Sequence, residues 1–392
     1  MLANVIQPVI SAISQLLRRS IILVTVLALA LAVALTGALL LTFKTNLGVF
    51  EERIGGMTWR MFPDNRLEER ITLVSIDEKS LSEVGPWPWP RSVMAELVSE
   101  IDSTGAQLQI HDIVYPAGER PGEELFERAL ATGNRSVLAQ LPVIQSGDGL
   151  RSGTLTHSIS GISCADQTQG GYFPVTESFI GANSSLVNIP KGHITPIIDS
   201  DGAIRKIPAV VCVDNAPYPA LSIAPFFQAI DSERWEASIS ERGGLLGPYR
   251  TLQLDAYPGL NIPLDDSGNL RISFRGSPSA FRSISAVDVL NGNYDASWFD
   301  NVWVLVGATA FGLDDIVPTP YSGATPGVEL QARMLGSLLD TAVPYTPRGA
   351  PLALGLLSTV FALVLWAVAI LRGRFAFIGL PLVALLAPVM AV

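Results

Sequence analysis

The sequence predicts an α/β fold, with a mixed, mostly parallel sheet flanked by transmembrane α-helices. Three apolar segments without a charged residue predict the membrane helices, and they enclose one long polar block, residues 44–350. Within this block, which we call the outer block, strand-like and helix-like segments alternate along the chain. Such alternation is the signature of parallel βαβ units.

The apolar segments are residues 20–43, 351–371 and 375–392, and we predict a transmembrane helix over each. The first holds about 24 uncharged positions, against the roughly 20 that cross a hydrocarbon core. We expect residues 1–19 to form a cytoplasmic segment. A cleavable signal peptide is the alternative for residues 20–43, but the apolar stretch is about twice as long as the hydrophobic region of such peptides.

Basic residues beside the apolar segments predict the orientation of the chain. Arg18 and Arg19 precede the first segment, and Arg372 and Arg374 separate the second from the third. Because cytoplasmic loops retain Arg and Lys, both pairs belong inside. Two crossings lie between the pairs, so the assignments agree, and they place the outer block in the periplasm.

The first half of the outer block reads as strand, helix, strand, helix, strand. Runs rich in β-branched residues predict strands, helical spacing of apolar residues predicts helices, and Gly and Pro mark the turns between them. The predicted strands are residues 71–77, 108–114 and 136–140, and the predicted helices are residues 91–103 and 123–131.

The second half begins with an irregular insertion, residues 146–185, which is rich in Gly, Ser and Thr. Residues 200–202 carry the chemistry of a hairpin turn. The further predicted strands are residues 186–190, 203–213, 271–274 and 302–306, and the further predicted helices are residues 220–230 and 327–339. The last helix precedes the second apolar segment by about a dozen residues, a position from which it can act on a membrane helix.

The outer block is strongly acidic. All 36 Asp and Glu residues lie in it, with 26 − 4 = 22 of the Lys and Arg residues, so its net charge is 22 − 36 = −14. Nucleic-acid-binding proteins need a basic face, so the negative net charge of the outer block excludes that class. Both cysteines, Cys164 and Cys212, fall in this block. In an oxidising compartment we expect them to form a disulfide, with two buried, unpaired thiols as the alternative.

Acidic residues follow several predicted strands. Asp77 ends the first strand, Asp112 lies near the end of the second, and Asp314 and Asp315 follow the strand at residues 302–306. Ligands of open α/β sheets bind beyond the carboxyl ends of the strands, so these residues are candidate ligands for a cation or a polar molecule. The alternative is that each carboxylate caps a helix or turn.

Two tryptophans and an arginine follow the first strand on a Pro-rich turn. Trp87 and Trp89 are candidates for stacking on a ligand, and Arg91 for a cation-π contact with a tryptophan face. The alternative is burial against the following helix, with Arg91 in a salt link to a strand-end acid.

No motif predicts catalysis. The three histidines lack the spacing of a metal site, and hydrolase, nucleotide and dinucleotide motifs are absent. We therefore predict no catalytic residue, no metal ligand and no cofactor in this chain.

Five motifs in order give the outer block a family resemblance. They are ITLVSIDEKSLSEVGPWPWPR, GAQLQIHDIVY, SLVNIP with DSDGAIRKIP, ISFRG, and VWVLVGATAFGLDDIVPTPYSGATPGVELQA. This pattern resembles the type-two CHASE domain, one of the cyclase and histidine-kinase associated sensory extracellular domains of bacteria. The resemblance covers roughly residues 44–346.

The resemblance implies a periplasmic sensor in a multi-pass inner-membrane receptor, with one span before the sensor and three after it. We therefore expect a fourth span and a cytoplasmic output domain to follow residue 392. The expected output is a class III adenylate or guanylate cyclase, and the alternatives are a histidine kinase, a diguanylate cyclase or a Ser/Thr kinase. Because such outputs work between two chains, we expect a homodimer.

The expected partners are the lipid bilayer, a second copy of the chain and an unknown periplasmic ligand or protein. A rival of another class is a non-signalling protein whose outer block docks an envelope component. An extracytoplasmic enzyme is disfavoured because the sequence lacks catalytic motifs.

Overall fold

The computed structural model of the protein describes most residues between 55 and 364. Outside the description lie residues 1–54, 57–58, 60, 62, 65, 117, 119, 134, 145–148, 165–171, 231–233, 242, 278–279, 314–315, 321, 351, 354, 358–359, 361–363 and 365–392. The predicted segments 1–19, 20–43 and 375–392 therefore fall outside it, as does most of 351–371. Among the described residues, no helix combines the length and the apolar character of a membrane span.

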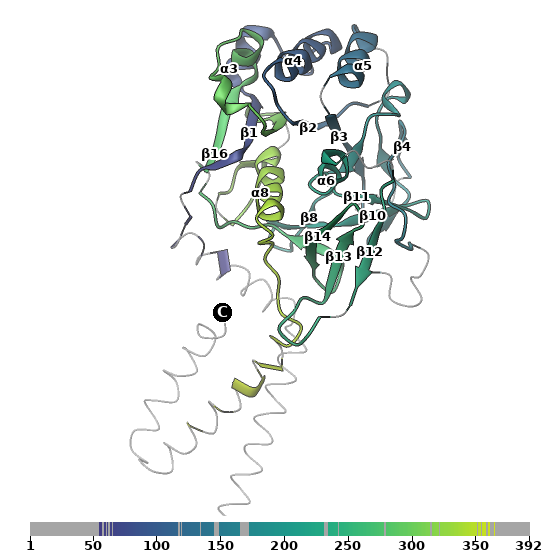
Figure 1. Cartoon of the computed structure of the whole chain (residues 1–392), viewed down its shortest axis with the longest axis vertical. Helices are drawn as coiled ribbons and strands as arrows, with labels where there is room; N and C mark the ends of the chain where they lie inside the picture. The colour runs from purple at the N-terminus through teal and green to yellow at the C-terminus, as the bar shows by residue number, and fades with distance from the viewer. Residues whose placement is uncertain are drawn as a thin grey trace, which may run out of the picture. The chain divides into compact units, whose positions relative to one another are not determined.

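A mostly parallel sheet forms the centre of the outer block (Figure 1). Its strands lie in the order β16, β1, β17, β2, β3, and each pair of neighbours runs parallel. Strand β7 also pairs parallel with β3, whereas β6 pairs antiparallel with it and carries β4 beyond. The bounds are β16 Phe281–Ser285, β1 Glu68–Ile76, β17 Trp303–Ala308, β2 Leu108–Val114, β3 Arg135–Pro142, β7 Lys191–His193, β6 Phe179–Ile180 and β4 Arg151–Ser152. The predicted mixed, mostly parallel α/β fold is confirmed.

Helices cover both faces of this sheet, as Figure 1 shows. One face packs against α3 (Glu78–Val84), α4 (Arg91–Ser103), α5 (Glu123–Thr132) and α7 (Ala286–Leu290), and the other against α6 (Ala224–Ala229) and α8 (Gly327–Leu339). Alternation along β1 divides its side chains between the two cores. Ile71 and Leu73 belong to the core that contains α8, while Val74 and Ile76 belong to the core that contains α3, α4 and α7, as the period of two in a strand requires.

Small sheets extend the core on the α6 and α8 face. Their buried leucines, isoleucines and valines join the same hydrophobic cluster as these two helices. They are β11–β10–β5, β12–β13–β14 and β15–β9–β8. The bounds are β5 Val175–Thr176, β8 Ile197–Ile198, β9 Ile204–Pro208, β10 Val210–Val213, β11 Ala216–Pro219, β12 Ala237–Ser240, β13 Arg250–Leu254, β14 Tyr257–Leu264 and β15 Asn269–Arg271.

Several predicted elements have the observed bounds, notably α4, β2 and α8. The strand predicted at residues 186–190 is wrong. A 3-10 helix, Ser184–Leu186, begins there because the Asn183 side chain accepts a hydrogen bond from the backbone of Ser185, and the strand starts only at Lys191. The strand predicted at residues 203–213 is divided into β9 and β10, and of residues 271–274 only Arg271 belongs to a strand.

Candidate functional site

A cavity of about 230 Å³ lies at the carboxyl end of the central sheet, against the first turn of α8. We call it the carboxyl-end cavity. Residues from β1, β16, the turn after β17 and α8 form its wall, so three strands and one helix meet there. They are Leu73, Ser75, Asp77, Phe281, Ser283, Thr309, Pro326, Val328 and Glu329.

Asp77 lies in the wall of this cavity and also caps α3. Its Oδ1 accepts hydrogen bonds from the backbone N–H of Ser80 at 2.9 Å and from the Ser80 hydroxyl at 2.7 Å. The hydroxyl of Ser285 donates to its Oδ2. Partial burial favours the neutral acid, but these hydrogen bonds outweigh it and hold the pKa of Asp77 below its ordinary value. The carboxylate is therefore ionised at neutral pH, with one side toward the cavity.

The first turn of α8 supplies the second carboxylate of the cavity. Glu329 accepts hydrogen bonds from Nη2 and Nε of Arg333, at 2.6 and 2.9 Å. The helix lies close to the sheet here because Gly307 has no side chain. A Cβ at Gly307 would stand 2.6 Å from the side chain of Val328. The local sequence thus holds Glu329 against the strand ends, where Ser75 and Ser283 share a hydroxyl–hydroxyl hydrogen bond of 3.0 Å.

The other predicted carboxylates do not line this cavity among the described residues. Asp112 is buried within β2, and β17 separates β2 from β1. The register pairs Ile76 with Ala308 and His111 with Val306. With this register, the spacing and rise of β-strands place the backbones of Asp77 and Asp112 at a distance of about 12 Å from each other. The structure therefore does not bring these two acids together. Asp314 and Asp315 lie outside the described residues.

One tryptophan of the Pro-rich turn packs into the protein core, while the prolines of the turn are exposed. Trp89 is buried and its Nε1 donates to the carbonyl of Gly85 at 2.9 Å, while Trp87 is half-buried and meets the Trp89 ring edge to face at 5.8 Å. Neither ring lines the carboxyl-end cavity. The position of Trp89 agrees with the alternative given above, in which this turn packs against the following helix.

Arg91 forms contacts that differ from those expected. It is 3 % exposed, and its Nε donates to Glu123 Oε2 of α5 at 3.3 Å. Its guanidinium lies 4.5 Å from the centre of the Tyr115 ring. The acidic partner is therefore on a helix and not at a strand end, and the aromatic partner is a tyrosine and not a tryptophan, because α4 turns the side chain toward α5. Burial lowers the pKa of Arg91.

A charged cleft of about 410 Å³, which was not predicted from the sequence, lies where β1 begins and α8 ends. Arg70 of β1 donates to Glu68 at 2.6 Å and to Asp340, the residue that ends α8, at 2.7 Å. We call this three-residue set the clasp. No local signal announces it, because Arg70 and Asp340 are 270 positions apart in the sequence.

A set of buried basic groups was also not predicted from the sequence. Lys191 is fully buried, and its Nζ donates to the carbonyls of Leu186 and Ile189 and to the hydroxyl of Thr156. Burial lowers its pKa to about 8. His111 is also fully buried and its Nδ1 lies 2.9 Å from the hydroxyl of Tyr115. The hydroxyl and carbonyl partners of Lys191 satisfy a charge that the apolar surroundings disfavour.

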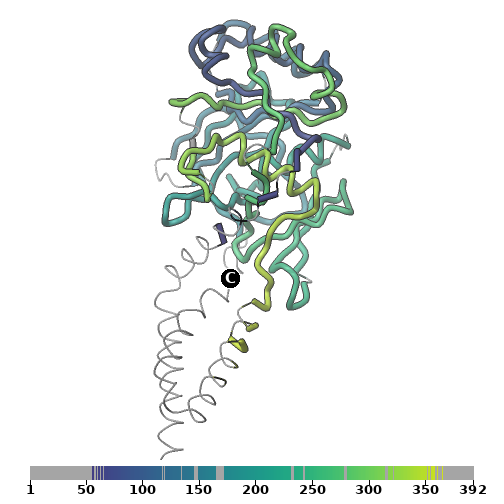
Figure 2. Tube along the Cα trace, turned by 90° about the vertical axis from the view of Figure 1, so that its left-hand side faces the viewer, coloured from purple at the N-terminus to yellow at the C-terminus, as the bar shows by residue number. Residues whose placement is uncertain are grey.

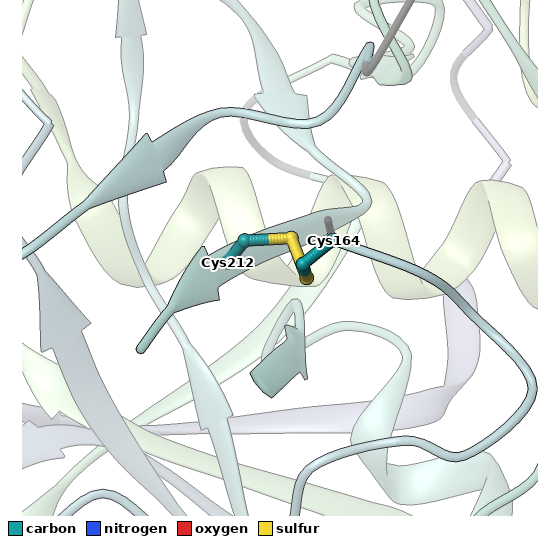
Figure 3. Close-up of a disulfide and its surroundings, with 2 residues drawn as sticks. All are labelled: Cys164 and Cys212. Atoms are coloured by element: carbon teal, nitrogen blue, oxygen red, sulfur yellow. A yellow bond between two sulfur atoms is a disulfide. The ribbon is translucent and has the colours of Figure 1, made fainter. Parts of the chain in front are cut away.

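The two cysteines form a disulfide, shown in Figure 3, with their Cα atoms 5.8 Å apart. Cys212 lies in β10, and Cys164 lies in the predicted insertion. The bond ties the insertion to the small sheet of β10 and β11. Within the described part of the chain, no group of three or more His, Cys, Asp or Glu residues is arranged to hold a metal ion.

Comparison with known protein families gives a match over most of the chain. The family model described as the CHASE2 domain matches residues 11–371. No curated protein and no solved structure matches the chain.

Proposed function

Because this chain belongs to the CHASE2 domain family, an extracellular sensor domain of signalling receptors, we propose that it is the periplasmic sensor and membrane region of a bacterial receptor. In this proposal residues 44–350 form the sensor domain, and residues 20–43, 351–371 and 375–392 anchor it in the inner membrane. The sensor passes a periplasmic signal to a cytoplasmic output domain. The output that we favour is a class III cyclase that makes a cyclic nucleotide such as cAMP.

The observation that carries the proposal is the position of α8. Glu329 in its first turn lines the carboxyl-end cavity, and Asp340 at its end pairs with Arg70 in the clasp. Its 13 residues span about 20 Å. Most of the helix is buried. We therefore expect it to move as a rigid body that connects the cavity to the chain leading to residue 351.

The chemistry of the cavity supports a small polar ligand that donates hydrogen bonds. Arg333 compensates the charge of Glu329, whereas the described partners of Asp77 are hydroxyls and a backbone N–H. The hydroxyls of Ser75, Ser283 and Thr309 offer further acceptors and donors. A cationic amine or a polyhydroxylated molecule fits this set, because an ionised carboxylate forms its strongest hydrogen bonds with charged or multiple donors.

The clasp supports coupling to the membrane. It joins the start of β1, which follows the first predicted span, to the end of α8, which precedes the second. Arg70 and Asp340 are about half exposed, so their bridge contributes at most about 1 kcal/mol. This is below the roughly 1–3 kcal/mol of typical allosteric couplings. A ligand that displaces α8 is therefore able to open the clasp.

Substitutions in a full-length receptor that carries this chain test the proposal. Asp77→Asn keeps a good helix cap but removes the one carboxylate charge of the cavity that Arg333 does not compensate, so it should abolish the response to ligand while the melting temperature stays nearly unchanged. Asp340→Asn should change the output without ligand. Asp295→Asn, which alters an exposed cap elsewhere, is the matched control. If all three variants signal like the parent, the proposed site is wrong, and residues 146–185 are the next place to search.

We also propose that the receptor is a homodimer, since class III cyclases complete their activity between two chains. A dimer mass for the chain in detergent and in lipid nanodiscs would support this. A strictly monomeric mass in both would contradict it.

A further inference from the structure

The turn between β12 and β13 exposes two leucines side by side. Leu245 is 65 % exposed and Leu246 is 84 % exposed. They lie in residues 243–249, GGLLGPY, which carry no charge and which we call the tip. A hydrogen bond from the Gly247 N–H to the Gly244 carbonyl, at 2.9 Å, closes the turn. The tip therefore presents apolar side chains from a closed turn in an otherwise acidic domain.

The chain that follows α8 is hydrogen-bonded to the tip. The N–H groups of Arg348 and Gly349 donate to the carbonyls of Gly247 and Leu245, at 2.8 and 2.7 Å. The hydroxyl of Tyr345 donates to the Leu246 carbonyl at 3.4 Å. In Figures 1 and 2 the yellow-green segment after α8 passes the end of this hairpin. The tip thus lies beside the chain immediately before residue 351.

Gly349 allows this close approach. A Cβ at position 349 would stand 2.7 Å from the Leu245 carbonyl oxygen, so a larger residue there would push the two segments apart. The sequence therefore specifies this contact at Gly349.

An apolar surface continues from this point along the chain. Its described members are all more than half exposed, and they are Leu352, Leu356, Leu357, Val360 and Val364. No charged residue occurs from residue 349 to residue 371. Contiguous exposed apolar surface of this kind marks a membrane or protein interface.

We propose that the tip is a membrane-contact element, with Leu245 and Leu246 inserted in the interfacial layer of the bilayer where the chain enters it. The inference rests on the proposed membrane anchoring of residues 351–371. If those residues enter the bilayer, the hydrogen bonds to Arg348 and Gly349 hold the leucines at its surface. Tyr345 and exposed Arg348 suit this depth, because tyrosine and arginine favour the membrane interface.

The tip gives the sensor domain a third contact with the membrane, beside its two proposed covalent connections to residues 20–43 and 351–371. Three contacts fix the tilt of a domain on the bilayer, whereas two leave it free to rotate about the line that joins them. A displacement of α8 then acts on the membrane helix against a fixed support.

A fluorescent probe at residue 246 tests the proposal in the full chain, held as one chain per lipid nanodisc. Both native cysteines are joined in the disulfide, so an introduced cysteine is the only reactive thiol. We would label Leu246→Cys with an NBD dye, and Leu125→Cys as the matched control. Leu125 is also exposed and apolar, but it lies on α5, on the other face of the sheet.

Quenching by spin-labelled lipid headgroups should be at least about twofold stronger at residue 246 than at residue 125, as expected for burial of about 5–10 Å in the interface. Gly349→Val in the Leu246→Cys background should remove the difference, while the tryptophan fluorescence of the folded domain stays unchanged. Equal quenching at both positions would overturn the proposal. The proposal would also be overturned if the dye at residue 246 were shielded from solvent only in nanodiscs that hold two chains. The tip would then contact a second copy of the chain.

Carbonate extraction separates this inference from the proposed anchoring. If carbonate releases the parent chain from membranes, both fail. If the chain stays in the membrane and residue 246 is not quenched, only the tip proposal fails.

Discussion

Lowering the pH from 8 to 5 should destabilise the sensor domain, because burial holds three histidines in the neutral form. It lowers the pKa of His111 and His193 to about 3, and burial together with the charge of Lys191 lowers that of His157 to about 4. An unfolded chain protonates histidine near pH 6.5. Below that pH the unfolded state binds more protons than the folded state, so stability is lost as the pH falls.

The magnitude follows from the difference between the folded and unfolded pKa values. At pH 5 the solution lies about 1.5 pH units below the unfolded value and above all three folded values, so each histidine costs about 2 kcal/mol. Three such sites cost about 6 kcal/mol, against a typical total stability of 5–15 kcal/mol. Lys191 has a pKa of about 8 in the folded state, so it changes the stability mainly above pH 8. Asp64 has a pKa lowered to about 2, so it changes the stability mainly below pH 4.

Urea unfolding at pH 8 and pH 5, followed by tryptophan fluorescence, measures this decline. Trp235 is a suitable reporter, since its ring stacks on Phe227 and lies 5.3 Å from His157. His193→Gln should reduce the decline by about 2 kcal/mol, because glutamine does not titrate, even if its stability at pH 8 is lower. The reasoning is refuted if the parent is as stable at pH 5 as at pH 8, or if the variant declines as much as the parent.

Three further results are expected. Gly307→Ala should destabilise the domain by about 1–3 kcal/mol, because the added methyl group overpacks against Val328. Gly259→Ala is the control; its methyl group meets open space and should change the free energy of unfolding by under about 0.5 kcal/mol. Equal effects of the two substitutions in denaturant titrations would contradict the packing argument. Reduction of the disulfide, with its separation of 48 residues, should cost about 4 kcal/mol in the same titrations, and an unchanged midpoint would show that the bond does not restrain the unfolded chain. Reporter fusions at Gly149 should be active for a periplasmic enzyme and fusions at Gly373 for a cytoplasmic one, and periplasmic activity at Gly373 would reverse the proposed orientation.

The sequence by itself determined the elements whose signals are local. In the succession β1, α3, α4, β2, α5, β3, every element except the short helix α3 was predicted, because strand and helix periodicities and Gly-Pro turns act within a few residues. The bounds of α8 were predictable for the same reason. The pairing of β1 with β16 and β17 was not, since these partners lie more than 200 residues later in the chain.

Tertiary structure alone decided which side chains meet. The insertion of β17 between β1 and β2 separated Asp77 from Asp112, while the packing of α8 on Gly307 brought Glu329 to the cavity that Asp77 lines. The same helix brought Asp340 to Arg70. A local sequence pattern predicts that a side chain is buried or follows a strand, but it does not predict which strands are neighbours in the sheet. That order results from packing summed over the whole core, and with it every long-range contact of these residues is set.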